Sequence, residues 1–189
     1  VKAARSLSKA VEAELPDLKL GSARFIVDQQ VDETRVAASG FDQVAFHVQT
    51  NPGTLPGPLM KVASGGELSR FLLALKVVLA DRGSAPVLIF DEIDTGVGGA
   101  VADAIGRRLK RLAGKVQVLT VTHAPQVAAR ADTHLFIEKQ SIAEGAFMRT
   151  RVRPLDGIAR KEEIARMLAG ATITPEARAA AGKLLSDVT

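Results

Sequence analysis

The spacing of apolar and polar residues predicts helices and strands in a definite order along the chain. Residues 1–15 place apolar side chains at intervals of three and four, the pattern of an amphipathic helix, and Pro16 ends it. From Arg24 to Gln49 apolar and polar residues alternate in two runs, which predicts two or three antiparallel strands. The prolines and glycines of residues 51–58 then indicate a loop.

Two apolar runs with a helix between them form the centre of the predicted fold. Val87–Phe90 and Val116–Thr122 are short, continuous and bounded by turn residues, as buried strands of a parallel sheet are. Residues 101–112 form an amphipathic helix between them, so the two strands are expected to lie parallel with a right-handed crossover. The predicted fold class is α/β: a parallel-rich sheet flanked by helices, with a small antiparallel portion.

The remaining elements are predicted from the same periodicities and from helix-capping residues. A largely apolar helix runs from Ser64 to about Leu79, and a final helix opens with Thr174 as cap and Pro175 in its first turn. Further helices are expected at residues 125–131 and 159–169, and further strands, which pair with each other, at residues 135–138 and 146–152.

Composition narrows the classes of protein to which the chain can belong. With 189 residues, 47% of them hydrophobic, it is long enough for one domain with a core, or slightly more. It has no cysteine, which excludes a disulfide framework and thiolate metal sites and suits a reducing cytoplasm. No apolar run reaches the roughly 18 residues that span a bilayer, so no membrane partner is expected. Because the chain begins with Val1, we expect it to be a piece of a longer protein.

The net charge of +4 is only mildly basic, but the basic residues cluster in two places. One cluster lies on the helix at 101–112 and comprises Arg107, Arg108, Lys110 and Arg111. A solvated helix face is the simpler interpretation, and DNA contact is the alternative. The second cluster, Arg149, Arg151 and Arg153, shares one strand face and is expected to be solvated. Tyrosine and tryptophan are absent, which argues against aromatic stacking on bases.

A glycine pair opens the helix that starts at residue 64. Ser64 and Glu67 have the spacing of a capping box, which explains both residues in purely structural terms. It does not explain Gly65 and Gly66, since each glycine costs a helix about 1 kcal/mol relative to alanine. Glycines in a first turn let a phosphate approach free amides at the positive end of the helix dipole. The sequence therefore predicts phosphate contact here.

Residues with side chains suited to catalysis or metal binding follow both predicted parallel strands. Asp91 and Glu92 end the first strand, where open α/β sheets place their ligands. Asp91 is suited to hold Mg²⁺ through its waters, and Glu92 to orient or deprotonate an attacking water. Alternatively, the pair simply caps the strand and begins a turn. His123 ends the second strand, where a neutral imidazole can hydrogen-bond a terminal phosphate or water, or can merely close the strand.

In chain order, these motifs resemble the signature, Walker B, D-loop and switch histidine of ABC-type ATPases. The amino-acid sequences of these motifs are similar to those of the SMC-like ATPases of bacterial DNA repair, and the resemblance covers nearly the whole chain. The stretches that carry it are Ala63–Arg70, Phe90–Gly99, Thr122–Ala128 and Glu162–Leu168.

The resemblance implies a particular place for the chain in a larger assembly. Heads of SMC-like ATPases are built from both ends of a protein that are separated by a coiled coil. Residues 1–15 would be the end of the returning coiled-coil arm or a leading helix, and residues 16–189 the C-terminal lobe of the head. The expected partners are the N-terminal lobe of the same protein, a second identical head and DNA. The expected setting is the cytoplasm, at the nucleoid, in repair of double-strand breaks.

The resemblance also implies roles for individual residues, with ATP and Mg²⁺ as cofactors. Asp91 would serve the metal, Glu92 and His123 would be catalytic, and the residues that contact the nucleotide of a second head would be Ser64, Gly65, Gly66, Glu67 and Asp94. The chain departs from the complete pattern because no Gly-x-x-x-x-Gly-Lys-Ser/Thr phosphate loop occurs in it. The chain alone is therefore expected to be inactive, with half of each site.

Two other functions compete with this interpretation. An ABC transporter nucleotide-binding domain would need a phosphate loop and an adenine-stacking aromatic in residues 1–63, and more often has glutamine where Glu67 stands. A non-catalytic clamp or DNA-end-binding module would have to explain why Asp91, Glu92 and His123 are all present. ATP turnover with the rest of the head present discriminates between a clamp and an ATPase.

Overall fold

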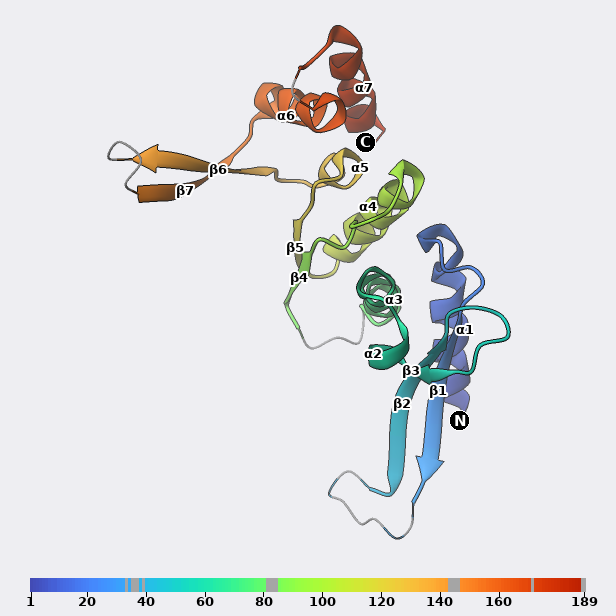
Figure 1. The fold of residues 1–189 in the computed structure, drawn as a ribbon. Helices are drawn as coiled ribbons and strands as arrows, with labels where there is room; N and C mark the ends of the chain where they lie inside the picture. The colour runs from blue at the N-terminus through green and yellow to red at the C-terminus, as the bar shows by residue number, and fades with distance from the viewer. Residues whose placement is uncertain are drawn as a thin grey trace. The chain divides into compact units, whose positions relative to one another are not determined.

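The chain forms two compact units, Val1–Val121 and Thr122–Thr189 (Figure 1). Each unit has its own buried core. The structure, a computed structural model, describes residues 1–32, 34, 38, 40–80, 85–142, 147–170 and 172–187. Over these ranges, none of the helices combines the length and apolar character needed to cross a bilayer.

The first unit begins with a helix packed on an antiparallel sheet. Its elements are α1 (Lys2–Glu14), the 3₁₀ turn η1 (Pro16–Leu18), β1 (Arg24–Val31), β2 (Asp42–Gln49) and β3 (Gly57–Pro58). The strand order is β1-β2-β3, with Phe25 opposite Val48, and both of these side chains are buried. The helix and the two main strands confirm the prediction. The third strand falls in the predicted loop, and Pro58 is tolerated there because an edge strand does not need its missing N–H.

A pair of parallel strands and three helices complete the first unit. These elements are α2 (Leu59–Val62), α3 (Gly65–Val78), β4 (Val87–Asp91), α4 (Gly99–Ala113) and β5 (Gln117–Val121). Strands β4 and β5 pair in parallel, from Val87 opposite Gln117 to Asp91 opposite Val121, with α4 as the crossover between them. This confirms the predicted centre of the fold. Helix α4 begins at Gly99, two residues before the predicted start, after Gly98 as its cap.

The second unit contains α5 (Pro125–Ala128), β6 (Leu135–Ile142), β7 (Phe147–Pro154), α6 (Gly157–Ala169) and α7 (Pro175–Ser186). Helices α6 and α7 pack side by side around Ile164, Ala165 and Ala181, while the β6–β7 hairpin extends away from them (Figure 1). Thr174 caps α7 as predicted, by accepting a hydrogen bond from the Ala177 amide at 3.2 Å. Helix α6 starts earlier than predicted because Asp156 caps it.

The α/β class and the two parallel strands are confirmed, but the antiparallel portion is larger than predicted. Of the strands in the described residues, β4 and β5 form the parallel sheet, whereas β1-β2-β3 and β6-β7 are antiparallel. The antiparallel part is larger because β6 runs to Ile142, four residues past the predicted end, and β7 pairs along its whole length. Parallel sheets normally have both faces covered by other elements, so a parallel pair with exposed aliphatic side chains is unusual.

Ion pairs join α4 to α1, where the sequence suggested either a solvated face or DNA contact. Arg108 is only 7% exposed. Its Nε donates to Glu14 Oε2 at 2.9 Å, and its Nη2 donates to Asp17 Oδ2 at 3.2 Å and to the Glu14 carbonyl at 3.1 Å. Arg111 also pairs with Glu14, at 2.5 Å, and Arg107 pairs with Asp103. Three of the four basic residues are thus neutralised by carboxylates, and DNA contact at this cluster is not supported.

Candidate functional site

The start of α3 has the capping box that the sequence predicted. The Ser64 hydroxyl accepts from the Glu67 amide at 3.4 Å, and the Ser64 amide donates to Glu67 Oε2 at 2.9 Å. The hydrogen bond from the Ser64 amide holds the pKa of Glu67 below its usual value. Both side chains therefore already have a structural role at the helix start.

The two glycines after Ser64 differ in their surroundings. A Cβ built at Gly66 lies 3.3 Å from Arg70 Nη1, the end of a flexible side chain, and at an ordinary contact distance of 3.6 Å from the Thr95 carbonyl oxygen. At Gly65, no described atom outside the adjacent residues and the backbone of α3 lies within 4 Å of such a Cβ. Gly66 thus lies against its own unit, whereas the space beside Gly65 is open to an outside group.

Glu92 directly follows β4 and has an unusual backbone conformation. Its φ of 48° lies in the left-handed region, which residues other than glycine rarely adopt. Its amide donates to the Val121 carbonyl at 3.1 Å, which continues the β4–β5 pairing by one bond. The carboxylates of Asp91 and Glu92 are both exposed at this strand end. Strained backbone at an exposed carboxylate is typical of functional sites.

The loop after Glu92 turns back on itself beside the start of α3. The Thr95 amide donates to the Glu92 carbonyl at 3.1 Å, and Gly96 has a φ of 72°. Ile93 and Asp94 are each 1% exposed, whereas Thr95 and Gly96 are exposed. The buried position of Asp94 does not test the predicted contact with a second subunit. The proximity of Thr95 to Gly66 shows that two of the predicted motifs meet within one unit.

His123 lies in the second unit, two residues after the end of β5. Its side chain is exposed, and the neighbouring Ala124 amide donates to the Thr122 hydroxyl at 3.0 Å. Because β4 and β5 are parallel with Asp91 opposite Val121, the chain leaves β5 at the same sheet edge that carries Asp91. The catalytic role of His123 stays a prediction.

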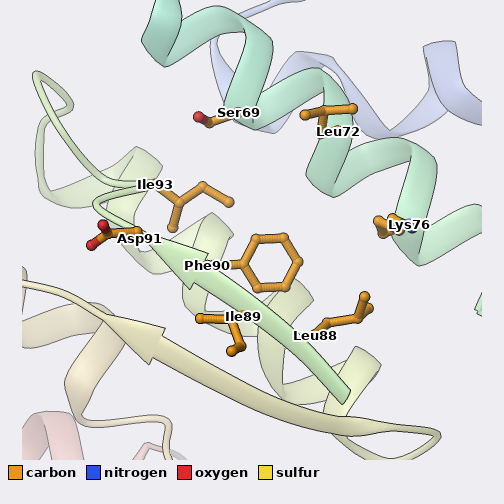
Figure 2. Close-up of a pocket in the computed structure, with 8 residues that line it drawn as sticks. All are labelled: Ser69, Leu72, Lys76, Leu88, Ile89, Phe90, Asp91 and Ile93. Atoms are coloured by element: carbon orange, nitrogen blue, oxygen red, sulfur yellow. The ribbon is translucent and has the colours of Figure 1, made fainter. Parts of the chain in front are cut away.

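A hollow of about 250 Å³ lies between α3 and β4 within the first unit (Figure 2). Figure 2 shows Ser69, Leu72 and Lys76 along α3, above β4, with Asp91 at the end of the strand. Of the predicted site residues, Asp91 is the one that lines the hollow. Its lining is mainly apolar, which suits packing against protein better than binding of a polyphosphate.

Arg70 belongs to this site although the sequence did not single it out. Its guanidinium packs against Gly66, one helical turn earlier, and its buried Nε has no hydrogen-bond partner in the described structure. Burial lowers the pKa of Arg70, and the nearby charge of Glu67 opposes this effect. Spacing of four residues from Gly66 was the available signal, because residues i and i+4 lie on one helix face.

The carboxylates fit a magnesium ion that arrives with a nucleotide. Among the described residues, no group of three or more histidine, cysteine, aspartate or glutamate side chains is placed to hold a metal ion. Mg²⁺ does not need such a cage, because it is usually bound by one or two carboxylates together with phosphate oxygens and waters. An exposed aspartate at the end of a parallel strand is a donor of this kind.

These elements form part of the fold found in the heads of SMC ATPases. A head domain from Pyrococcus yayanosii, solved with a coiled coil and joint, superposes with a TM-score of 0.60 and 20% identity, covering 85% of this chain and 28% of that one. A second solved chain, from work on ATP-driven dimerization and DNA-stimulated activation of SMC ATPases, gives a TM-score of 0.55 at 15% identity, covering 90% and 96%. At these identities the likeness concerns the fold.

The sequence relatives are more specific: the chain is homologous to proteins named DNA repair protein RecN. It is 44% identical over 182 residues to RecN of Rickettsia conorii and 42% identical over 185 residues to RecN of Vibrio cholerae, covering 96% and 98% of this chain. It spans about a third, 33%, of the length of these relatives, and corresponds to a C-terminal part. No family model matches the chain. These relatives give no support to the transporter alternative.

Proposed function

We propose that the chain is the C-terminal lobe of an SMC-like ATPase head in a RecN-type repair protein, and that two engaged heads hydrolyse ATP. The main support is the meeting of the α3 start with the loop after β4, where Gly66 approaches the Thr95 carbonyl. This contact brings the glycine-rich helix start beside the strand end that carries Asp91 and Glu92. The fold likeness and the names of the relatives support the same proposal.

Each predicted site residue has a role in this proposal. Glu92 takes the proton of the attacking water, and His123 hydrogen-bonds the terminal phosphate. Asp91 holds Mg²⁺, which supplies charge neutralisation at the phosphates when bound. The residues that we assign to contact with the nucleotide of the second head are Ser64, Gly65, Gly66, Glu67 and Asp94. The open space beside Gly65 suits the approach of a phosphate to the first amides of α3.

The parallel sheet supports an N-terminal lobe as the first partner. One face of β4 and β5 exposes aliphatic side chains, with exposed fractions of 41% for Val87, 70% for Ile89, 42% for Leu119 and 51% for Val121. Parallel strands occur almost only in sheets with both faces covered. We assign the cover to the remaining two-thirds of the longer protein, which also has to supply the phosphate loop.

The first prediction is that the isolated chain neither hydrolyses ATP nor binds it tightly. It has no phosphate loop, so it lacks the lysine and the backbone amides that hold the β- and γ-phosphates. Nucleotide binding and phosphate release are measured on the purified chain, alone and after co-expression with the upstream part of the protein. Micromolar affinity for ATP with Mg²⁺-dependent hydrolysis by the chain alone would contradict the proposal that the rest of the protein supplies the phosphate loop.

The second prediction concerns the second head. In the longer protein, Ser64→Arg fills the space at the α3 start with a bulky cation, while a variant without the phosphate-loop lysine keeps a sound α3 start. Each is expected to be nearly inactive alone. Mixed heterodimers regain one intact composite site, and the measurements are ATP turnover and ATP-induced pairing of the mixed heads.

Ser64→Ala is the comparison for this experiment because it removes the hydroxyl without adding bulk or charge, at a cost of about 1 kcal/mol of helix stability. The same hydroxyl is proposed to contact the nucleotide of the second head, so Ser64→Ala should lose part of the activity, but less than Ser64→Arg. The contrary result is a mixture with no more ATP turnover or head pairing than the separate variants, even when subunit exchange is confirmed. That result would contradict the proposal that the α3 start acts on the nucleotide of the partner head.

The names of the relatives support a role in DNA repair, and we extend that role to this chain as part of the proposal. DNA is then the third partner, after the N-terminal lobe and the second head. A repair ATPase of this kind works on chromosomal DNA, so we place the longer protein in the cytoplasm, at the nucleoid. Repair of double-strand breaks remains the specific process that the resemblance implies.

A further inference from the structure

The two basic clusters of the chain differ in how their charge is balanced. On α4, Arg107, Arg108 and Arg111 pair with the carboxylates of Asp103, Glu14 and Asp17. On β7, by contrast, no carboxylate among the described residues forms an ion pair with any of its three arginines, Arg149, Arg151 and Arg153. The sequence favoured a solvated face for both clusters, with DNA contact as the alternative for the first. The ion pairs instead make the second cluster the better candidate for DNA contact.

The register of the hairpin defines the face on which the β7 arginines lie. Arg149 lies opposite Gln140, Arg151 opposite Glu138 and Arg153 opposite Phe136. Glu138 is the one carboxylate among the residues opposite the arginines, and its Oε1 accepts a hydrogen bond from Gln140 at 3.1 Å. The Arg153 guanidinium lies 4.9 Å from the centre of the Phe136 ring. This basic face therefore carries three positive charges against one negative charge.

The opposite face of the hairpin carries four exposed apolar side chains beside the exposed polar residues Lys139, Ser141 and Thr150. The apolar ones are Leu135 at 50%, Ile137 at 58%, Met148 at 63% and Val152 at 55%. An apolar patch of this kind favours cover from protein. If the remaining part of the longer protein covers it, as we propose for the parallel sheet, the basic face is left directed at solvent.

We propose that the basic face of the β6–β7 hairpin, defined by Arg149, Arg151 and Arg153, binds the phosphodiester backbone of DNA. This inference rests on the proposed function, and it adds the place where DNA is held. Alternate residues of a strand lie about 6.8 Å apart, so the three guanidinium groups span about 14 Å along β7. That length covers roughly four phosphates of one DNA strand, at about 3.4 Å of axial rise each.

The chemistry of the face favours phosphate over bases. Arginine presents a planar fork of donors that matches phosphate oxygens in bidentate geometry. Among the described residues of this face, Phe147 is the one exposed ring on which a base can stack, with an exposed fraction of 66%. The Phe136 ring lies under the Arg153 guanidinium. Backbone contacts of this kind carry no sequence information, so binding should be strongly salt-dependent and insensitive to sequence.

The test replaces the three arginines together by glutamine in the longer protein. The probes are a fluorescent 40-base-pair duplex and one of its single strands, titrated between about 50 and 300 mM salt. We expect the affinity for at least one probe to fall about tenfold or more near 0.1 M salt. The slope of log K against log salt should shrink by up to about 2.7 for the duplex and about 2 for the single strand.

Two further variants separate charge at this face from charge in general. Lys2, Arg5 and Lys9 are exposed on α1, and their replacement by glutamine removes the same charge elsewhere. This control should leave the affinity near that of the parent. The triple Arg→Lys variant of the hairpin keeps the charge and should retain most of the salt slope. An α1 control that weakens binding as much as the hairpin variant would overturn the proposal.

DNA-free ATP hydrolysis distinguishes failure of this proposal from failure of the proposed function. The hairpin variant should hydrolyse ATP at the parent rate without DNA, since none of its changed residues belongs to the nucleotide site. Unchanged affinity and slope for both probes, with hydrolysis intact, would overturn the hairpin site. A parent protein without any ATP hydrolysis would instead contradict the ATPase function, and the DNA titrations would still decide where DNA binds.

Discussion

Replacing Glu92 by glutamine in the longer protein is expected to slow ATP hydrolysis by about 100-fold or more while ATP binding is retained. Glutamine has nearly the same shape as glutamate, but its amide cannot take the proton of the attacking water. The side chain is exposed, so the change removes no packing. The left-handed backbone at position 92 is equally strained in both residues, so stability should also be unaffected.

The measurement pairs single-turnover hydrolysis with equilibrium binding of ATP. Asp91→Asn is the matched control one residue earlier, and it should weaken the dependence on Mg²⁺ rather than remove the base. Hydrolysis at the parent rate by Glu92→Gln would show that another residue takes the proton. A loss of ATP binding in Glu92→Gln would instead assign this side chain to nucleotide contact.

Removing Arg108 is expected to have the largest effect on stability. Arg108→Ala leaves Glu14 without its buried partner, and breaking a buried ion pair typically costs about 3–5 kcal/mol. We expect the lower end, about 3 kcal/mol, because the side chain of Asp17 is 62% exposed and stays hydrated. Hydrogen exchange of the α1 and α4 amides in the longer protein should accelerate about 100-fold or more, because 1.4 kcal/mol corresponds to roughly tenfold.

Arg107→Ala is the control on the same helix. Its pair with Asp103 is a half-exposed contact between residues i and i+4, which contributes about 0.5 kcal/mol at most. Arg108→Met separates charge from packing, because methionine refills most of the volume but leaves Glu14 with the half-exposed Arg111 in place of its buried partner. If exchange in Arg108→Ala and Arg107→Ala is alike, the buried pair does not stabilise the contact between α1 and α4.

Local periodicity predicted the elements well because each signal lies within a few residues. The apolar runs of β4 and β5 and the Ser64–Glu67 capping box are local patterns of this kind. The cap at Asp156 is equally local and was missed, so α6 was predicted two residues short. The length of the β6–β7 hairpin was underestimated because the polar residues after Glu138 do not alternate with apolar ones.

Long-range contacts could not be predicted in this way. Arg108 and Glu14 are 94 residues apart, so nothing near Arg108 in the sequence indicates that it is buried and paired. The same holds at the candidate site, where Gly66 lies beside the Thr95 carbonyl, which belongs to a different sequence motif. The sequence indicated which residues have the required chemistry, whereas their burial and partners depend on tertiary packing.

The ion pairs between α1 and α4 have a mechanical consequence. Helix α4 is a rod of about 22 Å, at 1.5 Å per residue, and it begins directly after the loop that contains Asp94 and Thr95. Arg108 links α4 to Glu14, the last residue of α1, through an ion pair. If α1 is the end of a long arm, tension or twist along the arm acts through α4 on the loop that we propose lies beside the nucleotide. Pulling on the arms should therefore change how long two heads stay engaged.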